Sequence, residues 1–461
     1  MITHIQITDD ISIPYGNMHF IYNCSGYSKL HSKCVELEQS LKSDYKSFAL
    51  NYRMILEELV LAEETKRRII QSGMRFNEQT TREKITWEVT HSKQGYPDIL
   101  VQLCIASANS DKLEAFIKKQ TSTKVTWDTE TYHDELTKFI RSIFRFASQN
   151  LHSGEKTSGI VLDNDSCRDY FRKLFLFLCA YFGHDAKYDG ALIPFRDYYP
   201  VPRSVREQCG IILDKKKQLY VRLHDGQPRF YLFVSITVNI SDTEKRDTET
   251  IHKLWMDNLD SPQNVINNPT YVANKNGIDH KFWIYPLPSF PQSLTDSYIN
   301  SLSQEERILI VRGIVRGIAS MHNAEPPYYH RVISPSAFLI CRIKDKLKPL
   351  LINFDCVKDT DEDAEFTVLY AVYDAISDTE QPESTFAPEL LTDEEIDGDA
   401  IDWSKVDIYA LGKTISKVLF NTYELPNASS EMPEEQLQML QTICSEDAIN
   451  RPDINEIIHL F

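Results

Sequence analysis

The stretch Tyr329-His330-Arg331-Val332-Ile333-Ser334-Pro335-Ser336-Ala337-Phe338-Leu339-Ile340 decides how the second half of this chain is interpreted. Two basic residues stand near its start, an apolar run closes it, and Pro335 lies between them. The stretch contains no carboxylate, carboxamide or lysine. Just upstream, residues 308–318 are apolar at every third or fourth position, which predicts a helix with one buried face.

Further short motifs stand in a fixed order around this stretch. They are Gly317-Ile318-Ala319-Ser320-Met321-His322, Leu351-Ile352-Asn353-Phe354-Asp355, Phe386-Ala387-Pro388-Glu389, Asp407-Ile408-Tyr409-Ala410-Leu411-Gly412 and Arg451-Pro452. One such fragment can arise by chance in any α+β domain. Several of them in order over about 130 residues are much more specific than a single motif.

Together these motifs resemble those of protein kinases, and the resemblance covers residues 205–461. It implies an α+β bilobal fold, with an N-lobe over 207–288 and a C-lobe over 289–461. It also implies a buried ion pair between Glu389 and Arg451. The other residues to which it gives structural roles are His330, Arg331 and Asp407.

The reactive positions of that family are replaced here. The resemblance puts Val332 in the place of the base aspartate, Ser334 in that of a phosphate-contacting lysine and Ala337 in that of a magnesium-binding asparagine. Asn353 replaces the metal-binding aspartate and is a poorer ligand for a hard cation. Phosphoryl transfer needs metal ligands, a lysine on the phosphates and a carboxylate that orients the nucleophile. We therefore predict a pseudokinase with no bound cofactor and no metal.

The predicted N-lobe lacks its phosphate-binding parts as well. In Val234-Ser235-Ile236-Thr237 the resemblance places Thr237 at the lysine position. The expected first hairpin, 208–223, has only Gly210 and no Gly-x-Gly-x-x-Gly loop. Asp355 could bind a metal from the glycine position of the motif, but a solvated loop aspartate is the better interpretation.

The segment 355–389 is rich in carboxylates. Such a run is usually a solvated loop. The functional alternative is that it docks on a basic surface of a protein partner, or that Arg331 holds one of its carboxylates.

The first half is expected to be an all-α domain over 1–185, joined by an extended linker over 186–206. Apolar residues recur at helical spacing in 28–40, 45–65, 106–119, 131–150 and 165–182. Short β-branched or aromatic runs then predict strands at 208–213, 218–223, 230–240, 270–273 and 280–285.

Two quoted stretches carry a second resemblance: Gly16-Asn17-Met18-His19-Phe20-Ile21-Tyr22, and Phe48-Ala49-Leu50-Asn51-Tyr52-Arg53-Met54-Ile55-Leu56-Glu57-Glu58-Leu59-Val60. They resemble the amino-terminal helical domain of type I restriction motor subunits and other prokaryotic defence proteins, related to the HEPN superfamily. The similarity is one of pattern and covers residues 14–185.

HEPN ribonucleases carry an arginine and, four to six residues later, a histidine. Arg145 and His152 match that spacing with six intervening residues, followed by Ser153-Gly154. A histidine can move protons at a ribose hydroxyl and an arginine can stabilise the phosphorane charge. The resemblance then implies RNA as substrate and a dimeric site. The alternative is a helix-terminal histidine that binds carbonyl groups, beside a surface arginine.

Composition sets the frame for these predictions. The chain has 461 residues and a net charge of −17, which argues against a surface built wholly for nucleic acid but leaves room for a local basic groove. Nine cysteines are scattered singly without a C-x-x-C pair, which suggests core thiols in a reducing compartment. No signal pattern and no membrane span are recognised, so a cytoplasmic protein is expected.

The leading hypothesis is a regulatory, sensing or scaffold protein in prokaryotic defence against phage, forming a homodimer or a hetero-complex. The first alternative is a metal-independent ribonuclease that uses Arg145 and His152 under control of the kinase-like half. The second is an unconventional ATP-dependent transferase.

Overall fold

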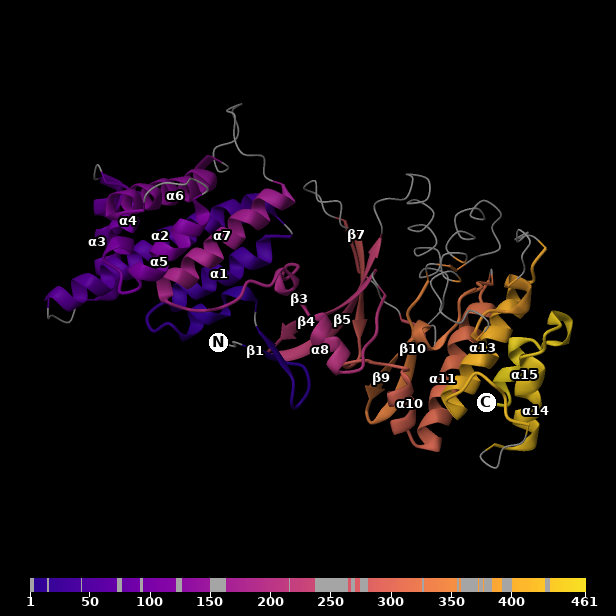
Figure 1. Ribbon diagram of the computed structural model, residues 1–461. Coiled ribbons are helices and arrows are strands. Elements are labelled where there is room, and N and C mark those ends of the chain that lie inside the picture. The colour runs from indigo at the N-terminus through magenta and orange to yellow at the C-terminus, as the bar shows by residue number, and fades with distance from the viewer. Residues whose placement is uncertain are drawn as a thin grey trace. The chain divides into compact units, whose positions relative to one another are not determined.

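The computed structural model describes residues 4–14, 16–42, 44–72, 77–91, 94–121, 127–149, 163–214, 216–236, 264–266, 270–273, 281–325, 327–354, 356–357, 372, 376, 384–391, 400–427 and 432–461. The chain divides into two compact units (Figure 1). The first is mainly Met1–Pro202 with Val221–Pro228; the second is mainly Arg203–Tyr220, Arg229–Ala273 and His280–Phe461. The finer division at residues 185, 206 and 288 remains a prediction.

The first unit opens with a short antiparallel hairpin of β1 (His4–Gln6) and β2 (Ser12–Pro14). The prediction of an all-α domain is therefore wrong at its amino-terminal end. The 3-10 helix η1 (Asn17–Asn23) follows. The remaining helices are α1 (Ser28–Ser40), α2 (Tyr45–Ser72), α3 (Glu78–His91), α4 (Tyr96–Ile105), α5 (Ser110–Gln120), α6 (Thr129–Gln149) and α7 (Asn164–Phe182).

Helix α7 shows how local chemistry sets the helix ends. The Asp163 side chain accepts a hydrogen bond from the Ser166 amide, and the Ser166 hydroxyl bonds back to the Asp163 amide in a capping box. The helix ends at Gly183, whose φ of 69° is left-handed. A Cβ there would lie 2.4 Å from Oδ1 of Asn109, so the position needs glycine.

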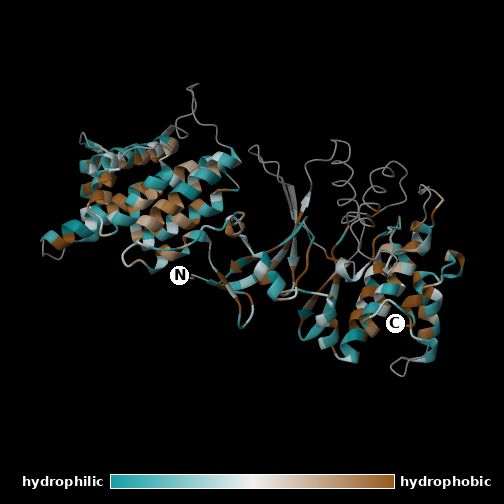
Figure 2. Cartoon of the chain, in the orientation of Figure 1, coloured by the Kyte–Doolittle hydropathy of each residue, from teal (hydrophilic) through white to brown (hydrophobic). Residues whose placement is uncertain are grey.

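The core of the first unit is aromatic. Figure 2 shows apolar residues recurring along its helices. Phe146 of α6 stacks on Tyr170 of α7 at 3.7 Å between ring centroids, and Tyr52 of α2 packs edge-on against both. Because aromatic pairs add to the free energy of burial, this contact stabilises the α2, α6 and α7 packing.

The segment after α7 packs on the first unit. Ile193 joins its core, and its carbonyl accepts a hydrogen bond of 2.7 Å from the Lys42 ammonium. The hydroxyl of Tyr199, in β3 (Tyr199–Pro200), accepts one of 2.9 Å from Gln39. Burial and, after it, the nearby charge of Arg168 lower the pKa of Lys42 to about 8.

A five-stranded sheet of order β3-β4-β5-β7-β6 follows. It contains β4 (Lys217–His224), β5 (Gln227–Ile236), β6 (Thr270–Ala273) and β7 (Lys281–Leu287). The turn between β4 and β5 is Asp225-Gly226, with φ of 51° and 77°. Positive φ at both turn residues suits the twist of a two-residue hairpin. The strand predicted at 208–213 is wrong, because α8 (Arg203–Gln208) ends there and Gly210 turns the chain at a φ of 70°.

A smaller sheet of β8 (Gln292–Ser293), β9 (Phe338–Ile343) and β10 (Lys346–Leu351) lies against the helices of the second unit. The longest of these helices are α11 (Gln304–His322) and α13 (Trp403–Phe420). The others are α10 (Asp296–Ser301), α14 (Glu434–Ile443) and α15 (Ile454–Ile458), with the 3-10 turns η3 (Pro335–Ala337), η6 (Pro388–Leu390) and η7 (Ala448–Asn450).

Two glycines let α11 approach its neighbours closely. A Cβ on Gly317 would lie 3.1 Å from the carbonyl oxygen of Asn264, and one on Gly313 would lie 2.4 Å from the Pro349 side chain. Residues 264–266 are joined to β10 by backbone hydrogen bonds between Asn264, Ile266 and Leu351. The segment 264–266 is thus fixed between α11 and β10.

All nine cysteines are free, and most are buried. None of the helices in the described part of the chain is long and apolar enough to span a membrane.

One buried carboxylate fixes the start of η1. Glu38 of α1 accepts hydrogen bonds from the Asn17 amide at 2.6 Å, the Asn17 side chain at 3.0 Å and the Met18 amide at 3.2 Å. Gly16 has a φ of 79°, and a Cβ there would lie 2.3 Å from a Glu38 oxygen. Burial raises the pKa of Glu38 to about 7, against the opposing effect of these donors.

This pKa predicts a pH dependence of stability. Between pH 4.5 and 7 the folded chain holds a proton on Glu38 that the unfolded chain releases, so this contribution to the free energy of unfolding falls as pH rises. We expect wild type to lose about 3 kcal/mol relative to Glu38→Gln across this window, measured by urea unfolding at several pH values.

The matched control is Glu36→Gln, which changes an exposed carboxylate of the same helix. Its difference from wild type should stay nearly constant with pH. A constant difference for Glu38→Gln would contradict the assignment.

Candidate functional site

The carboxylate of Asp407 binds the loop that follows α11. Asp407 belongs to α13 and is fully buried. Asp407 accepts hydrogen bonds of 2.6 Å from both the His330 and the Arg331 amides. His322, at the end of α11, places Nε2 3.0 Å from the same carboxylate. Three of the residues predicted as structural, His330, Arg331 and Asp407, therefore meet at one buried charge.

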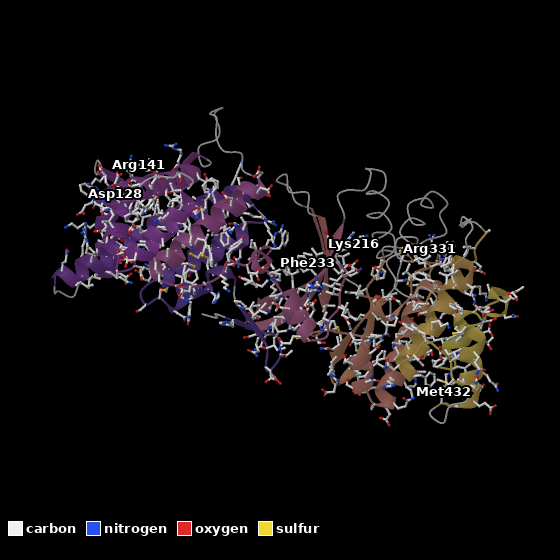
Figure 3. All side chains as sticks on the ribbon, in the orientation of Figure 1. Asp128, Arg141, Lys216, Phe233, Arg331 and Met432 are labelled. Atoms are coloured by element: carbon white, nitrogen blue, oxygen red, sulfur yellow. The ribbon has the colours of Figure 1, made fainter. Side chains whose placement is uncertain are left out.

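Arg331 adopts a left-handed backbone conformation, with a φ of 70°. Figure 3 labels Arg331 in the second unit. Its buried guanidinium lies 4.3 Å from the ring centroid of Trp403. Two amide bonds to Asp407 on consecutive residues offset the cost of this conformation. The carboxylate that Arg331 was predicted to hold from 355–389 lies outside the described part of that segment.

The neighbouring Tyr329 faces His322, with ring centroids 5.3 Å apart. Burial raises the pKa of Tyr329, and the charges of Asp402 and Asp407 add to the effect. The phenol is therefore an ordinary neutral hydroxyl at neutral pH and no proton acceptor.

Val332, at the predicted base position, lies in apolar surroundings. It packs against a hydrophobic cluster that includes Cys356, Val372 and Phe386, from the segment beyond β10. Trp403, on which Arg331 stacks, belongs to the same cluster. An apolar side chain against these neighbours has no group that could orient or deprotonate a nucleophile.

The positions that follow Val332 are equally limited. Ser334 and Ser336 place their hydroxyls 2.8 Å apart. Ala337 is buried, and its carbonyl accepts a hydrogen bond of 2.9 Å from the Ile352 amide. A methyl group at 337 supplies no metal ligand.

Asn353 follows β10 and is half-buried. Its Oδ1 accepts a hydrogen bond of 2.9 Å from the ammonium of Lys217, which also forms an ion pair with Asp214. Only 2% of the Lys217 side chain is exposed. Lys217 ends a run of three lysines, a pattern usually typical of a solvated turn, yet the structure buries its side chain. Counting back from buried Leu219 along an alternating strand would have placed Lys217 on the inner face.

Two other predicted positions lie outside the described residues: Thr237, next after β5, and Asp355. Within the described residues, no group of three or more His, Cys, Asp or Glu side chains could hold a metal ion.

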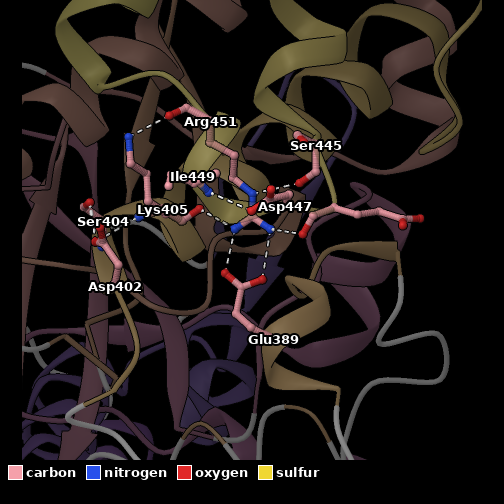
Figure 4. Close-up of polar contacts among 9 residues, drawn as sticks. Glu389, Asp402, Ser404, Lys405, Ser445, Asp447, Ile449 and Arg451 are labelled. Carbon is pink, nitrogen blue, oxygen red and sulfur yellow. Dashed lines mark hydrogen bonds and ion pairs between the residues drawn. The ribbon is translucent and has the colours of Figure 1, made fainter.

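Another buried charge of this unit is Arg451. Its guanidinium forms a two-pronged ion pair with Glu389, at 2.6 and 2.9 Å, so the predicted pair is present (Figure 4). The remaining donors reach the carbonyl oxygens of Ser445, Lys405 and Glu446. Arg451 is buried as predicted, whereas Glu389 keeps 26% of its side chain exposed.

In the first unit, Arg145 of α6 is exposed, and His152 lies outside the described residues. The Arg145–His152 pair is not brought together by anything that the structure describes, so a ribonuclease site remains a prediction.

No protein-family model matches this chain, and no curated protein matches it. Among solved structures, the chain is similar to a crystal structure of the PknI kinase domain of Mycobacterium tuberculosis, a double mutant. Sequence identity is 15%, the TM-score is 0.39, and the match covers 59% of this chain and 98% of that one.

Replacing Asp407 by asparagine should destabilise the second unit. The asparagine side chain keeps one acceptor oxygen, but its NH₂ group would face one of the N–H donors that the carboxylate now binds. We expect a loss of about 2–3 kcal/mol in the free energy of unfolding, measured by urea titration. Asp402→Asn makes the same change at the exposed N-cap of α13, where asparagine caps equally well, and should be nearly neutral. Equal effects at the two positions would contradict this role.

Arg451→Lys keeps the positive charge but should still lower the free energy of unfolding. One ammonium cannot replace a planar guanidinium that binds Glu389 and three carbonyl groups. The expected loss is about 3 kcal/mol, typical of a broken buried pair. Arg203→Lys, in an exposed pair with Glu207, is the comparison and should change the melting temperature little. Similar melting temperatures for the two variants would refute this explanation.

Proposed function

We propose that the second unit is a kinase-like scaffold that does not transfer phosphoryl groups, and that the protein acts by binding a protein partner. The resemblance of the first half to helical domains of defence proteins supports a regulatory or sensing role in prokaryotic defence against phage. A protein partner would bind the kinase-like unit, with the acidic segment 355–389 as one contact.

The packing of Val332 carries this proposal. A kinase needs a carboxylate within hydrogen-bond reach of the hydroxyl that it phosphorylates. At the corresponding position this chain has an isopropyl group, which packs against the apolar cluster described above. An isopropyl group in an apolar cluster supplies no acceptor for the proton of a nucleophile.

The environment of Asn353 supports the same conclusion. Its only acceptor oxygen receives the Lys217 ammonium. A divalent cation at Asn353 would therefore have to displace a buried positive charge. The loop scaffold, by contrast, retains its buried bonds to Asp407 and the pair between Glu389 and Arg451. Support for a folded platform is thus stronger than support for a catalyst.

The direct test is transfer of labelled phosphate from ATP, with magnesium or manganese, onto the protein itself and onto a generic protein acceptor. An active kinase domain serves as the positive reference. We expect no transfer above the background without protein. Transfer that depends on this chain would overturn the proposal in favour of an unconventional transferase.

A second test asks whether Val332 is only a missing catalytic base or a residue that packs the loop. Val332→Asp should not restore transfer; it should lower the free energy of unfolding by about 1–3 kcal/mol, because the carboxylate enters apolar surroundings. Ser336→Asp, at an exposed position of the same loop, should be tolerated. A stable and active Val332→Asp variant would show that only the base was missing.

A further inference from the structure

Lys217 is the buried lysine at the start of β4, and its ammonium contacts two oxygen partners among the residues that the structure describes. Nζ donates a hydrogen bond to Oδ1 of Asn353 at 2.9 Å and pairs with the carboxylate of Asp214. The lysine side chain is 2% exposed, while that of Asp214 is 50% exposed. A buried ammonium persists only where such partners replace its hydration.

The local backbone builds this arrangement. Asp214 opens a tight turn in which its carboxylate accepts a hydrogen bond of 2.9 Å from the Lys216 amide, and its carbonyl accepts one of 3.2 Å from the Lys217 amide. The turn brings the carboxylate back over the first residue of β4. Asn353, two residues after β10 ends, accepts a hydrogen bond from the same ammonium.

The chemistry of the three groups is that of a filled cation site. Two oxygen acceptors, one of them charged, point at a single compact positive charge. Carboxylate and carboxamide oxygens are also what a divalent cation would bind. The ammonium takes up the one acceptor oxygen of Asn353, and a second cation beside it would meet like-charge repulsion.

We propose that Lys217 is a resident cation, which takes the place of a metal ion between Asp214 and Asn353. The inference rests on the proposed function, because that proposal is what makes Asn353 the counterpart of a metal-binding residue in kinases. It adds that the second unit joins β4 to the loop after β10 without any divalent ion. The strand and the loop are then held together by the chain's own charge.

The test compares melting temperatures in EDTA, in millimolar magnesium or calcium chloride, and in sodium chloride of matched ionic strength. Wild type should be insensitive to the divalent ions. Lys217→Met should lose about 4–8 °C and recover part of the loss with a divalent ion, because two oxygens now face an unfilled position. Lys216→Met, an exposed neighbour of the same type, should show neither effect.

If Lys217→Met does not fold, a second variant still tests the proposal. Asn353→Asp places another carboxylate on the ammonium and should remain insensitive to divalent ions. Stabilisation of wild type or Asn353→Asp by magnesium would overturn the proposal, as would equal behaviour of the two lysine variants in all three solutions.

These outcomes are independent of the transfer assay. A wild type that is insensitive to metal but transfers phosphate would refute the proposed function alone. A wild type that is stabilised by magnesium but transfers nothing would refute the resident cation alone.

Discussion

The second unit depends on one buried negative charge, the carboxylate of Asp407. A carboxylate without exposure is costly unless its lone pairs are satisfied, and here two amides and a histidine satisfy them. Because both amides belong to consecutive residues of the loop, the carboxylate fixes the loop's path as well as its position. The stacking of Arg331 on Trp403 and the packing of Val332 depend on the loop path that this carboxylate fixes.

The buried charges and the replaced positions obey different physical rules. Asp407 and Arg451 each hold several backbone groups, so losing either side chain would leave buried donors or acceptors unpaired. Val332, Ser334 and Ala337 hold little besides their own surroundings. The side chains at 332, 334 and 337 are therefore less constrained by backbone hydrogen bonds than these two charges are.

Local signals in the sequence predicted much of the fold. The helix over 28–40 has the predicted ends, and so does the strand over 270–273, because each follows a clear periodicity. The ion pair of Glu389 and Arg451 was also predictable, although only through resemblance. The helix and the strand were predictable because their deciding residues lie within one element, whereas Glu389 and Arg451 are 62 residues apart and were linked only by the resemblance.

The failures depend on tertiary context. The stretch 208–213 is apolar enough for a strand, yet it continues from a short helix and turns at Gly210. Lys217 follows two other lysines, and charge runs are usually solvated, so only its partners Asp214 and Asn353 explain its burial. Asn353 is 136 residues away in sequence, and no local pattern predicts that contact.

The close approach at Gly317 has a mechanical consequence. Between α11 and the backbone of Asn264 there is no layer of side chains, and such a layer is what normally absorbs small shifts by changing rotamers. Residues 264–266 are also hydrogen-bonded to β10. A displacement of this segment would therefore move both the helix and the strand, because the stiff contact at Gly317 and these hydrogen bonds transmit it to α11 and β10 together.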